Sequence, residues 1–356
     1  AYRFSIAWPR LFPTADGEVN EAGFAFYNRL IDCIIAHGLE PLVTLYHWDL
    51  PQYLEDQGGW ANRDTVYAYE QYVSACVDAY GDRIQQWTTL NEPWVFGWLG
   101  YNLGVHAPGK RDLPAAIAAA HHTALAHGVG TRAIRRIKPD AVVGLTLNMT
   151  NYVIDGPSSD DLDTLRDLMD ANLNRWWIDA FLTGHYPKNL VESYGEHLAS
   201  VVKPGDSELL KVSTDFLGIN YYSDSFLALP RESDQPVGLS GPFPFAQRAC
   251  TEIPSHLVDN LTTMGWPVTP RGLGELLERI HRDYPEIPAL VVTENGAAFE
   301  DEVSADGTVN DPRRVNYLVD HITSVARAIE NGAPVIGYFA WSLLDNFEWA
   351  EGYAKR

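Results

Sequence analysis

The sequence predicts an α/β fold built on a parallel β-sheet, and three observations lead to this prediction. Short apolar runs alternate along the chain with longer runs in which apolar residues recur at helical spacing. Most of the short runs are rich in β-branched and aromatic residues and apolar on both faces, which is typical of parallel strands covered on both sides. No low-complexity segment, Gly/Ser-rich linker or break in composition divides the 356 residues. We therefore expect residues 1–356 to form a single domain.

Seven segments have the composition of such strands, in this order: YRFSIAW (2–8), PLVTLYHW (41–48), IQQWTTLN (84–91), AVVGLTLN (141–148), FLGINYY (216–222), ALVVTEN (289–295) and PVIGYFAWS (334–342). Between them, helical spacing predicts long helices over 21–38, 63–81, 113–139 and 312–332. The first, second and last of these end at a glycine, which is a common helix stop. The stretches 155–167 and 230–244 are expected to be surface excursions.

Polar and aromatic residues cluster where most of the predicted strands end. The clusters are His47-Trp48-Asp49, Asn91-Glu92-Pro93, Asn148, Asn220-Tyr221-Tyr222, Glu294-Asn295 and Trp341-Ser342. In a TIM barrel the C-terminal strand ends converge on one site, whereas a doubly wound sheet would concentrate such residues near one switch point. The spread over many strands favours the (β/α)8 TIM barrel. A complete barrel has eight strands, so we expect this chain to be a fragment that lacks the first strand and the last helix.

Composition bears on the partners of the protein. The net charge is −21 and the estimated pI is near 4.8, which argues against nucleic acid and anionic membranes, since both require a basic face. No run approaches 18 apolar residues, so no transmembrane helix is expected. Three cysteines at long spacings, Cys33, Cys76 and Cys250, are predicted to be reduced core thiols rather than a disulfide framework or a zinc site.

The histidines on the third long helical segment are the remaining candidates for a metal site. His121, His122 and His127 are not part of an HExxH motif, so we interpret them as satisfied interior residues. Gly-rich phosphate loops of the GxGxxG or GxxxxGK[ST] type are also absent from the sequence. We therefore predict neither a metal nor a cofactor.

Two strand ends carry a glutamate next to an asparagine, in LNEP (90–93) and TENG (293–296). In a barrel, strands that are distant in sequence can direct two carboxyl groups into one cavity. Glycoside hydrolysis requires such a pair, about 5–5.5 Å apart for retention of configuration or about 6.5–9.5 Å for inversion. The alternative is that each glutamate caps the helix after its strand. For a single glutamate the alternative is preferable, but two of them, accompanied by Trp, His, Asn and Tyr at other strand ends, favour the catalytic interpretation.

The motifs TLNEP, VVTENG, YRFSIAWPR, LYHWDLP, GINYY and WSLLDNFEWAEGYAKR together resemble those of glycoside hydrolase family 1, the β-glucosidase family. The resemblance extends in order over essentially the whole chain. It implies a single (β/α)8 barrel, of which this chain would hold strands 2 to 8. It also implies a retaining enzyme with Glu92 as the acid/base and Glu294 as the nucleophile. By the same comparison, Arg3 and Tyr222 would keep the nucleophile ionised.

The family also implies a set of substrate-binding residues. His47, Trp48, Asn91 and Asn220 would bind the sugar, with Asn91 at the 2-hydroxyl. Trp341 would lie under the sugar ring, Glu348 and Trp349 would bind the hydroxyls at positions 4 and 6, and Trp266 would form an aromatic wall for the aglycone. For each tryptophan the alternative is core packing. The family's first strand supplies a glutamine to the glycone site, and that segment is absent from this sequence.

The implied substrates are small β-glucosides and cello-oligosaccharides, which connects the chain to carbohydrate metabolism and cellulose degradation. Galactosides and fucosides are expected as secondary substrates. A branch of the family acts on 6-phosphorylated sugars, but the carboxylate of Glu348 would repel a phosphate. The alternatives that stay open are a 6-phospho-β-glucosidase, a catalytically inactive fragment and a sugar-binding relative. We further expect a cytoplasmic protein that can form a homo-oligomer.

Overall fold

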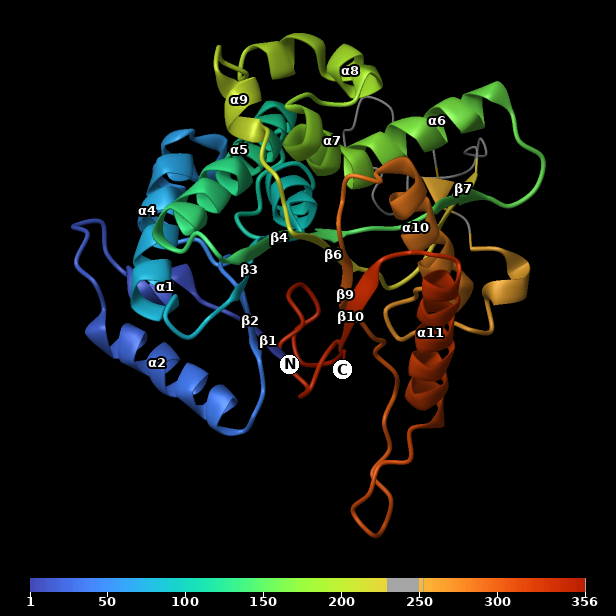
Figure 1. The fold of residues 1–356 in the computed structure, drawn as a ribbon. Coiled ribbons are helices and arrows are strands. Elements are labelled where there is room, and N and C mark those ends of the chain that lie inside the picture. The colour runs from blue at the N-terminus through green and yellow to red at the C-terminus, as the bar shows by residue number, and fades with distance from the viewer. Residues whose placement is uncertain (229–249, 252, 356) are drawn as a thin grey trace. The chain divides into compact units, whose positions relative to one another are not determined.

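The computed structural model describes residues 1–228, 250, 251 and 253–355 (Figure 1). The expected excursion at 230–244 lies outside the described residues. The chain divides into two compact units. The first unit comprises Ala1–Leu147 and Arg175–Leu217, and the second comprises Asn148–Asn174 and Gly218–Arg356.

A parallel sheet forms the centre of the first unit. Its strands follow one another in chain order: β1 (Tyr2–Ser5), β2 (Pro41–Thr44), β3 (Gln86–Asn91) and β4 (Val142–Asn148). Each strand lies inside its predicted segment. The first prediction extends too far, because Trp8 already begins a helix whose first turn contains Pro9. Proline has the backbone geometry of a first helical turn and cannot donate to a sheet.

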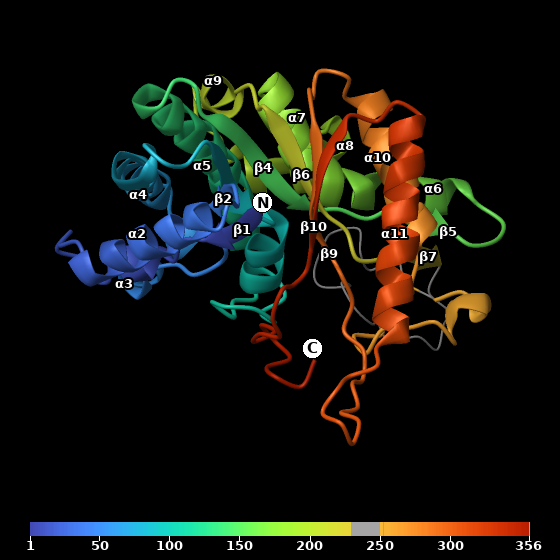
Figure 2. The same cartoon turned by 60° about the horizontal axis from the view of Figure 1, so that its bottom comes forward.

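Helices cover this sheet, and the predicted segments 21–38, 63–81 and 113–139 are confirmed as α2, α4 and α5. The long helix α5 lies beside α4 in both ribbon views (Figures 1 and 2). A side chain at Gly128 of α5 would overlap the carbonyl oxygen of Leu209, so glycine permits the close approach of the helix at Asp206–Leu210. The helical elements of the first unit are α1 (Trp8–Leu11), α2 (Glu21–Ala36), α3 (Gln52–Asp56), η1 (Gly59–Ala61), α4 (Asp64–Tyr80), η2 (Val95–Leu99), α5 (Leu113–Ile137), α7 (Trp176–Thr183), α8 (Lys188–Ala199) and α9 (Asp206–Leu210).

A buried ionic network connects α4, α5 and α9. Asp206 is 1% exposed and accepts two hydrogen bonds from the guanidinium group of Arg63. His121 Nε2 lies 2.9 Å from Asp206 Oδ2, and its Nδ1 lies 2.7 Å from the hydroxyl oxygen of Tyr186. Burial, the largest single influence, raises the pKa of Asp206, but hydrogen bonds from Arg63, His121 and the amide of Lys203 together hold it below 3.8.

The other two predicted interior histidines are also buried and paired. His122 Nδ1 lies 2.9 Å from the carbonyl oxygen of Trp60, and His127 Nδ1 lies 2.8 Å from the hydroxyl oxygen of Thr89. Burial lowers the pKa of His122 to about 4 and that of His127 to about 3. All three histidines are interior residues as predicted, but His127 is not fully satisfied, because its Nε2 is buried without a hydrogen-bond partner among the described residues.

Three of the predicted strands belong wholly or partly to the second unit. They are β6 (Phe216–Asn220), whose first two residues belong to the first unit, β9 (Leu290–Asn295) and β10 (Val335–Ala340). Strands β9 and β10 are parallel, with irregularities in register between Val335 and Gly337 and between Tyr338 and Ala340. A smaller sheet that the sequence did not predict contains β5 (Tyr152–Ile154), β7 (Ser225–Ala228) and β8 (Cys250–Thr251).

The predicted helix at 312–332 is confirmed as α11, and it lies side by side with α10 (Figure 2). The apolar face of α10 buries Leu273, Leu276, Leu277 and Ile280, whose spacing is that of one helix face. The helical elements of the second unit are α6 (Asp160–Asp170), η3 (Ala171–Arg175), η5 (Ser255–Leu257), α10 (Pro270–Asp283) and α11 (Pro312–Glu330).

The stretch 155–167 lies at the surface as expected, since residues 155–161 are exposed, and it includes the first turns of α6, which begins at Asp160. Ser159 caps this helix by accepting from the amide of Leu162, and acidic residues in the first turn favour the helix N-terminus. Cys76 is buried as predicted, but Cys33 is exposed because α2 buries a different face, with Ile31 and Ile34. Both thiols are free.

Candidate active site

In the first unit, Asn91 at the end of β3 connects several of the predicted sugar-binding residues. Arg3 Nη2 donates to Asn91 Oδ1 at 2.6 Å, and Asn91 Nδ2 lies 3.3 Å from His47 Nε2. Since Arg3 can only donate, the amide oxygen of Asn91 faces Arg3 and its NH2 group faces the imidazole. The indole Nε1 of Trp48 donates to the backbone carbonyl oxygen of Asn91 at 2.9 Å. The structure thus brings Arg3, His47, Trp48 and Asn91 together.

Glu92 follows directly and is 5% exposed. Its amide donates to the carbonyl oxygen of Thr146 in β4, and its own carbonyl oxygen accepts from the amide of Val95. Glu92 has a φ of +49° and Trp48 a φ of +84°. In the left-handed region each such non-glycine residue costs roughly 1–3 kcal/mol, and strain of this kind concentrates at functional sites. Backbone strain therefore marks two of the strand ends that the sequence predicts to be functional.

In the second unit, Glu294 lies near the end of β9 and is 3% exposed. The hydroxyl of Tyr222 donates to Glu294 Oε2 at 2.6 Å, a length typical of a hydrogen bond to an ionised carboxylate. The amide of Tyr221 donates to the carbonyl oxygen of Glu294 at 3.0 Å. Both the side chain and the backbone of Glu294 are therefore held by the segment that follows β6. The predicted pairing of Tyr222 with Glu294 is present.

Glu348 is another acidic residue of the second unit. Burial, followed by the negative charges of Glu294 and Glu351, raises the pKa of Glu348. Its amide donates to the carbonyl oxygen of Gly352 at 2.8 Å, so the C-terminal segment folds back at this residue. Glu348 and Glu294 are therefore near enough for each charge to affect the other.

Three of the remaining predicted residues of the second unit contact neighbours of Glu294 in the chain or in its hydrogen bonding. Asn220 is 1% exposed, and its Oδ1 accepts from the hydroxyl of Thr293 at 2.6 Å. The ring of Trp266 lies 5.5 Å from that of Tyr222 and is 39% exposed, as is Trp349. Trp266 and Trp349 are therefore not core residues, which removes the alternative of core packing for both. The amide of Trp341 donates to the carbonyl oxygen of Asn295 at 2.9 Å, which fixes the chain at the end of β10.

Sequence reasoning missed the polar contacts around Asn295. This residue is fully buried, and its amide group contacts Tyr221, Tyr317 and Tyr338. Its position beside Glu294 at a strand end was a visible signal. The tyrosine partners carried no comparable signal, because Tyr317 lies on α11 and Tyr338 lies within a strand.

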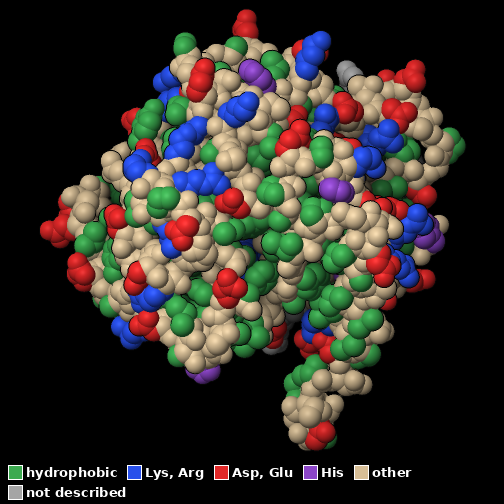
Figure 3. Space-filling model, in the orientation of Figure 1, with side chains coloured by type: hydrophobic (Ala, Val, Ile, Leu, Met, Phe, Trp, Pro, Cys, Tyr) green, Lys and Arg blue, Asp and Glu red, His purple; other side chains and the backbone are tan. Residues whose placement is uncertain are grey.

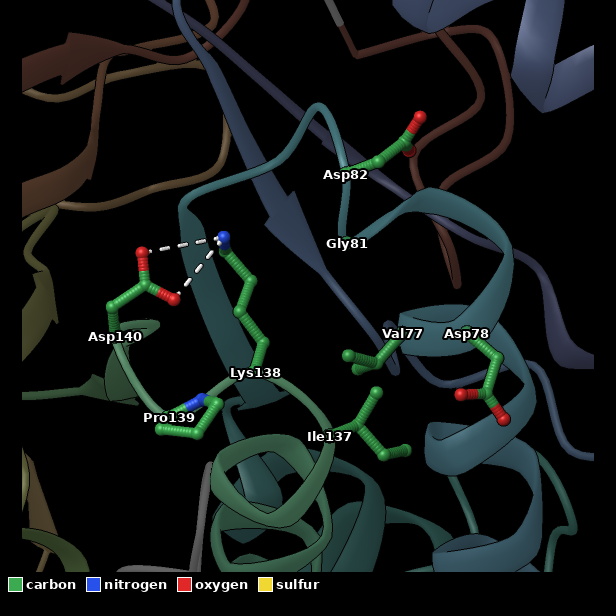
Figure 4. A pocket seen from close by; sticks show the side chains of 8 residues that line it. All are labelled: Val77, Asp78, Gly81, Asp82, Ile137, Lys138, Pro139 and Asp140. Carbon is green, nitrogen blue, oxygen red and sulfur yellow. Dashed lines mark hydrogen bonds and ion pairs between the residues drawn. The ribbon is translucent and has the colours of Figure 1, made fainter.

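A surface cleft in the first unit contains none of the predicted site residues (Figure 4). Its volume is about 340 Å³, and Lys138 reaches toward Asp140 within it, with the charged atoms 3.3 Å apart. The cleft lies between the C-terminal end of α4 and the start of β4. In a parallel sheet this is the end opposite to Asn91 and Glu92, so we do not assign it to the site.

The described residues also bear on metal binding and on membrane-spanning helices. Within the described part of the chain, no group of three or more His, Cys, Asp or Glu side chains could hold a metal ion. The helices of that part include none that is both long and apolar enough to cross a membrane. Figure 3 shows carboxylates spread among Lys and Arg side chains over one face of the molecule.

Comparison with known proteins identifies the family. Residues 1–356 match the model of "Glycosyl hydrolase family 1". The chain is 40% identical to Beta-glucosidase A of Thermotoga maritima over 356 residues, which cover 100% of this chain and 76% of that protein. It is 43% identical over 371 residues to a bifunctional beta-D-glucosidase/beta-D-fucosidase of Bifidobacterium breve, covering 100% of this chain and 77% of that protein.

Solved structures agree with these sequence matches. A family 1 β-glucosidase from Thermotoga maritima in complex with isofagomine lactam superposes with a TM-score of 0.90 at 38% identity, covering 100% of this chain and 76% of that one. A psychrophilic β-glucosidase from Micrococcus antarcticus gives a TM-score of 0.91 at 43% identity, covering 100% and 77%. The predicted α/β class of TIM-barrel type is thereby confirmed. The chain is a glycosidase and belongs to glycosyl hydrolase family 1.

Proposed function

We propose that the protein is a retaining β-glucosidase that removes terminal, non-reducing β-D-glucosyl residues by double displacement. The hydrogen bond from the hydroxyl of Tyr222 to Glu294 is the observation that carries this proposal. A short hydroxyl donor holds a buried carboxylate in a fixed orientation, which a nucleophile requires. A carboxylate that served only as a helix cap would instead accept from backbone amides at the helix start.

In the first step, one oxygen of Glu294 attacks the anomeric carbon and the bond to the aglycone oxygen breaks. Glu92 gives its proton to that departing oxygen, which leaves a glucosyl ester on Glu294. In the second step, water attacks the same carbon while Glu92 takes its proton, and the ester bond to Glu294 breaks. Glucose is released, and both carboxyl groups return to their starting states.

We assign Glu92 as the acid because it is buried directly after Asn91 at the end of β3 and has a strained backbone. We propose that Asn91 binds the 2-hydroxyl through its NH2 group, because Arg3 occupies its amide oxygen. Arg3 is also proposed to support Glu294, as the family implies.

The glycone would be bound by His47, Trp48, Asn91 and Asn220. Trp341 would support the face of the sugar ring, and Glu348 and Trp349 would bind the hydroxyls at positions 4 and 6. Trp266 packs on Tyr222 while remaining partly exposed, which suits an aromatic wall for the aglycone.

The preferred substrates are unphosphorylated. Near Glu294, the carboxylate of Glu348 would repel a 6-phosphate and can accept hydrogen bonds from two hydroxyls. Side activity on β-fucosides is proposed because the relative from Bifidobacterium breve is named for both sugars, and activity on β-galactosides remains a prediction from the sequence. Cello-oligosaccharides are proposed because a 39% identical relative from Thermotoga neapolitana is named a 1,4-beta-D-glucan glucohydrolase. The single barrel domain, the cytoplasmic location and the homo-oligomer remain predictions.

Replacement of Glu294 by glycine tests the proposal. The matched control is Glu302→Gly, which lies in an exposed part of the chain. We expect Glu294→Gly to lose hydrolysis of an aryl β-glucoside while its far-UV circular dichroism is unchanged. Azide should restore turnover and give the α-glucosyl azide, because the small anion replaces the missing carboxylate from the same face. Unchanged turnover without azide would refute the nucleophile role. Preferential hydrolysis of an aryl 6-phospho-β-glucoside by the unaltered protein would favour the alternative activity.

Replacement of Glu92 by alanine tests the acid. General acid catalysis contributes roughly 10²- to 10⁴-fold, so cellobiose hydrolysis should fall by about that factor. The first step with a dinitrophenyl glucoside needs little proton donation and should be much less affected. Equal losses for both substrates would count against Glu92.

A further inference from the structure

Asn295 is hydrogen-bonded through both ends of its side-chain amide. Its Nδ2 donates to the carbonyl oxygen of Tyr221 at 2.7 Å and to the hydroxyl oxygen of Tyr317 at 3.1 Å. Its Oδ1 accepts from the hydroxyl of Tyr338 at 2.6 Å. The side chain is fully buried, so these contacts replace hydration entirely.

Only one assignment of donors and acceptors is possible for these hydrogen bonds. A backbone carbonyl only accepts, so the nitrogen of Asn295 must face Tyr221. The same rule makes the hydroxyl of Tyr317 the donor to the carbonyl oxygen of Tyr222, 3.1 Å away. Tyr317 must then accept from Asn295, and Tyr338 must donate to Asn295. A flipped amide would bring oxygen against oxygen at Tyr221.

The tyrosines are held in place as donors. Burial raises the pKa values of both Tyr317 and Tyr338, so the two hydroxyls stay protonated. The ring of Tyr317 stacks on His321 with centroids 3.9 Å apart, and His321 Nδ1 lies 2.7 Å from the carbonyl oxygen of Tyr317. The hydroxyl of Tyr317 is therefore anchored from within α11.

The network encloses the contact between Tyr222 and Glu294. Asn295 follows Glu294 in the chain and binds the carbonyl oxygen of Tyr221, whose amide binds the carbonyl oxygen of Glu294. Tyr317 binds the carbonyl oxygen of Tyr222, whose hydroxyl binds the carboxylate of Glu294. Buried side chains thus hold the backbone of Tyr221 and Tyr222, and the amide of Tyr221 in turn holds the backbone of Glu294.

We propose that Asn295 is a positioning residue that, with Tyr317 and Tyr338, fixes the hydroxyl of Tyr222 against Glu294. Tyr338 completes the network from β10, and its removal leaves the amide oxygen of Asn295 without this donor. The amide can then rotate, and the segment Tyr221–Tyr222 loses a constraint. The hydrogen bonds of the three residues lead to the segment Tyr221–Tyr222, so we assign them a role that acts through Tyr222. The inference rests on the proposed nucleophilic role of Glu294.

The test measures how fast Glu294 is labelled by 2-deoxy-2-fluoroglucosyl fluoride, which accumulates the covalent ester because fluorine slows its hydrolysis. Tyr338→Phe removes only the hydroxyl and should slow labelling by about 5- to 100-fold, the factor that corresponds to one unsatisfied buried polar group. Tyr186→Phe is the matched control, because it also removes a hydrogen-bonded hydroxyl, 2.7 Å from His121 in the first unit. The control should label at the unaltered rate.

A double variant distinguishes positioning from general loosening of the fold. If Tyr338 acts through Tyr222, Tyr338→Phe should slow labelling little further in a Tyr222→Phe background. Effects that multiply fully in the double variant would overturn the proposal, as would an unaltered rate in Tyr338→Phe. If Tyr338→Phe does not fold, Tyr317→Phe removes the donor to Tyr222 while retaining the ring that stacks on His321, and the same criteria apply to it.

The same experiment distinguishes failure of the positioning role from failure of the proposed function. Labelling of the unaltered protein at a residue other than Glu294, or no labelling, would refute the proposed function itself. Labelling of Glu294 in the unaltered protein, together with the unaltered rate in Tyr338→Phe, would refute only the positioning role. Peptide mass mapping identifies the labelled residue in each case.

Discussion

Replacement of Tyr222 by phenylalanine isolates the hydrogen bond on which the proposed mechanism depends. The change removes one hydroxyl, 2.6 Å from Glu294 Oε2, and leaves the ring that packs against Trp266. A hydrogen bond to a charged group contributes about 1.5–3 kcal/mol. Its loss should therefore lower kcat/KM for an aryl β-glucoside by about 10- to 150-fold, since each 1.4 kcal/mol is a factor of ten.

The assay is kcat/KM for an aryl β-glucoside, with far-UV circular dichroism to check that the variant folds. Glu302→Gln, in an exposed part of the chain, is the control and should leave kcat/KM unchanged. An unchanged or higher kcat/KM in Tyr222→Phe would refute the reasoning.

Three further predictions concern packing and stability. Gly296→Ala would drive a Cβ into the carbonyl oxygen of Trp341, so we expect KM for glucosides to rise by about tenfold or more as Trp341 is displaced, since each 1.4 kcal/mol of lost binding is a factor of ten. Asp206→Ala removes the carboxylate that pairs with Arg63 and should lower the free energy of unfolding in urea by about 3–5 kcal/mol. Loss of an exposed ion pair lowers it by at most about 1 kcal/mol. Because burial lowers the pKa of His127 to about 3, the unfolded state binds this proton first as pH falls below about 6.5. Stability should therefore drop by about 2 kcal/mol between pH 7 and pH 5, and His127→Gln should lack this component of the pH dependence of urea unfolding.

The parts of the fold that could be predicted are those that depend on the composition of short segments. Runs such as PLVT at 41–44 are buried along their length and contain β-branched residues, so their identity as strands follows from the sequence. The polar residues at the strand ends were visible for the same reason, because Asn91 and Glu294 interrupt apolar runs. Their hydrogen bonds were not visible. The contact between Arg3 and Asn91 depends on the pairing of separate strands.

Features that depend on register or on distant packing escaped prediction. Tyr338 pairs with Val292, but a shift in register follows, and Ala340 pairs with Asn295. Sequence alternation alone does not place such a shift, so the contact between Tyr338 and Asn295 could not be foreseen. Cys33 was assigned to the core by residue type, whereas the buried face of α2 is set by the elements that pack on it. The strained backbone of Trp48 and Glu92 likewise becomes visible only in the structure.

The anomeric configuration of the first-formed product tests the central claim most directly. Proton NMR of a β-glucoside hydrolysis, recorded before the anomers of glucose equilibrate, distinguishes β-glucose from α-glucose. Two successive displacements at one carbon, by Glu294 and then by water, predict that β-glucose appears first. Initial formation of α-glucose would show a single displacement by water, and would contradict the assignment of Glu294 as the nucleophile.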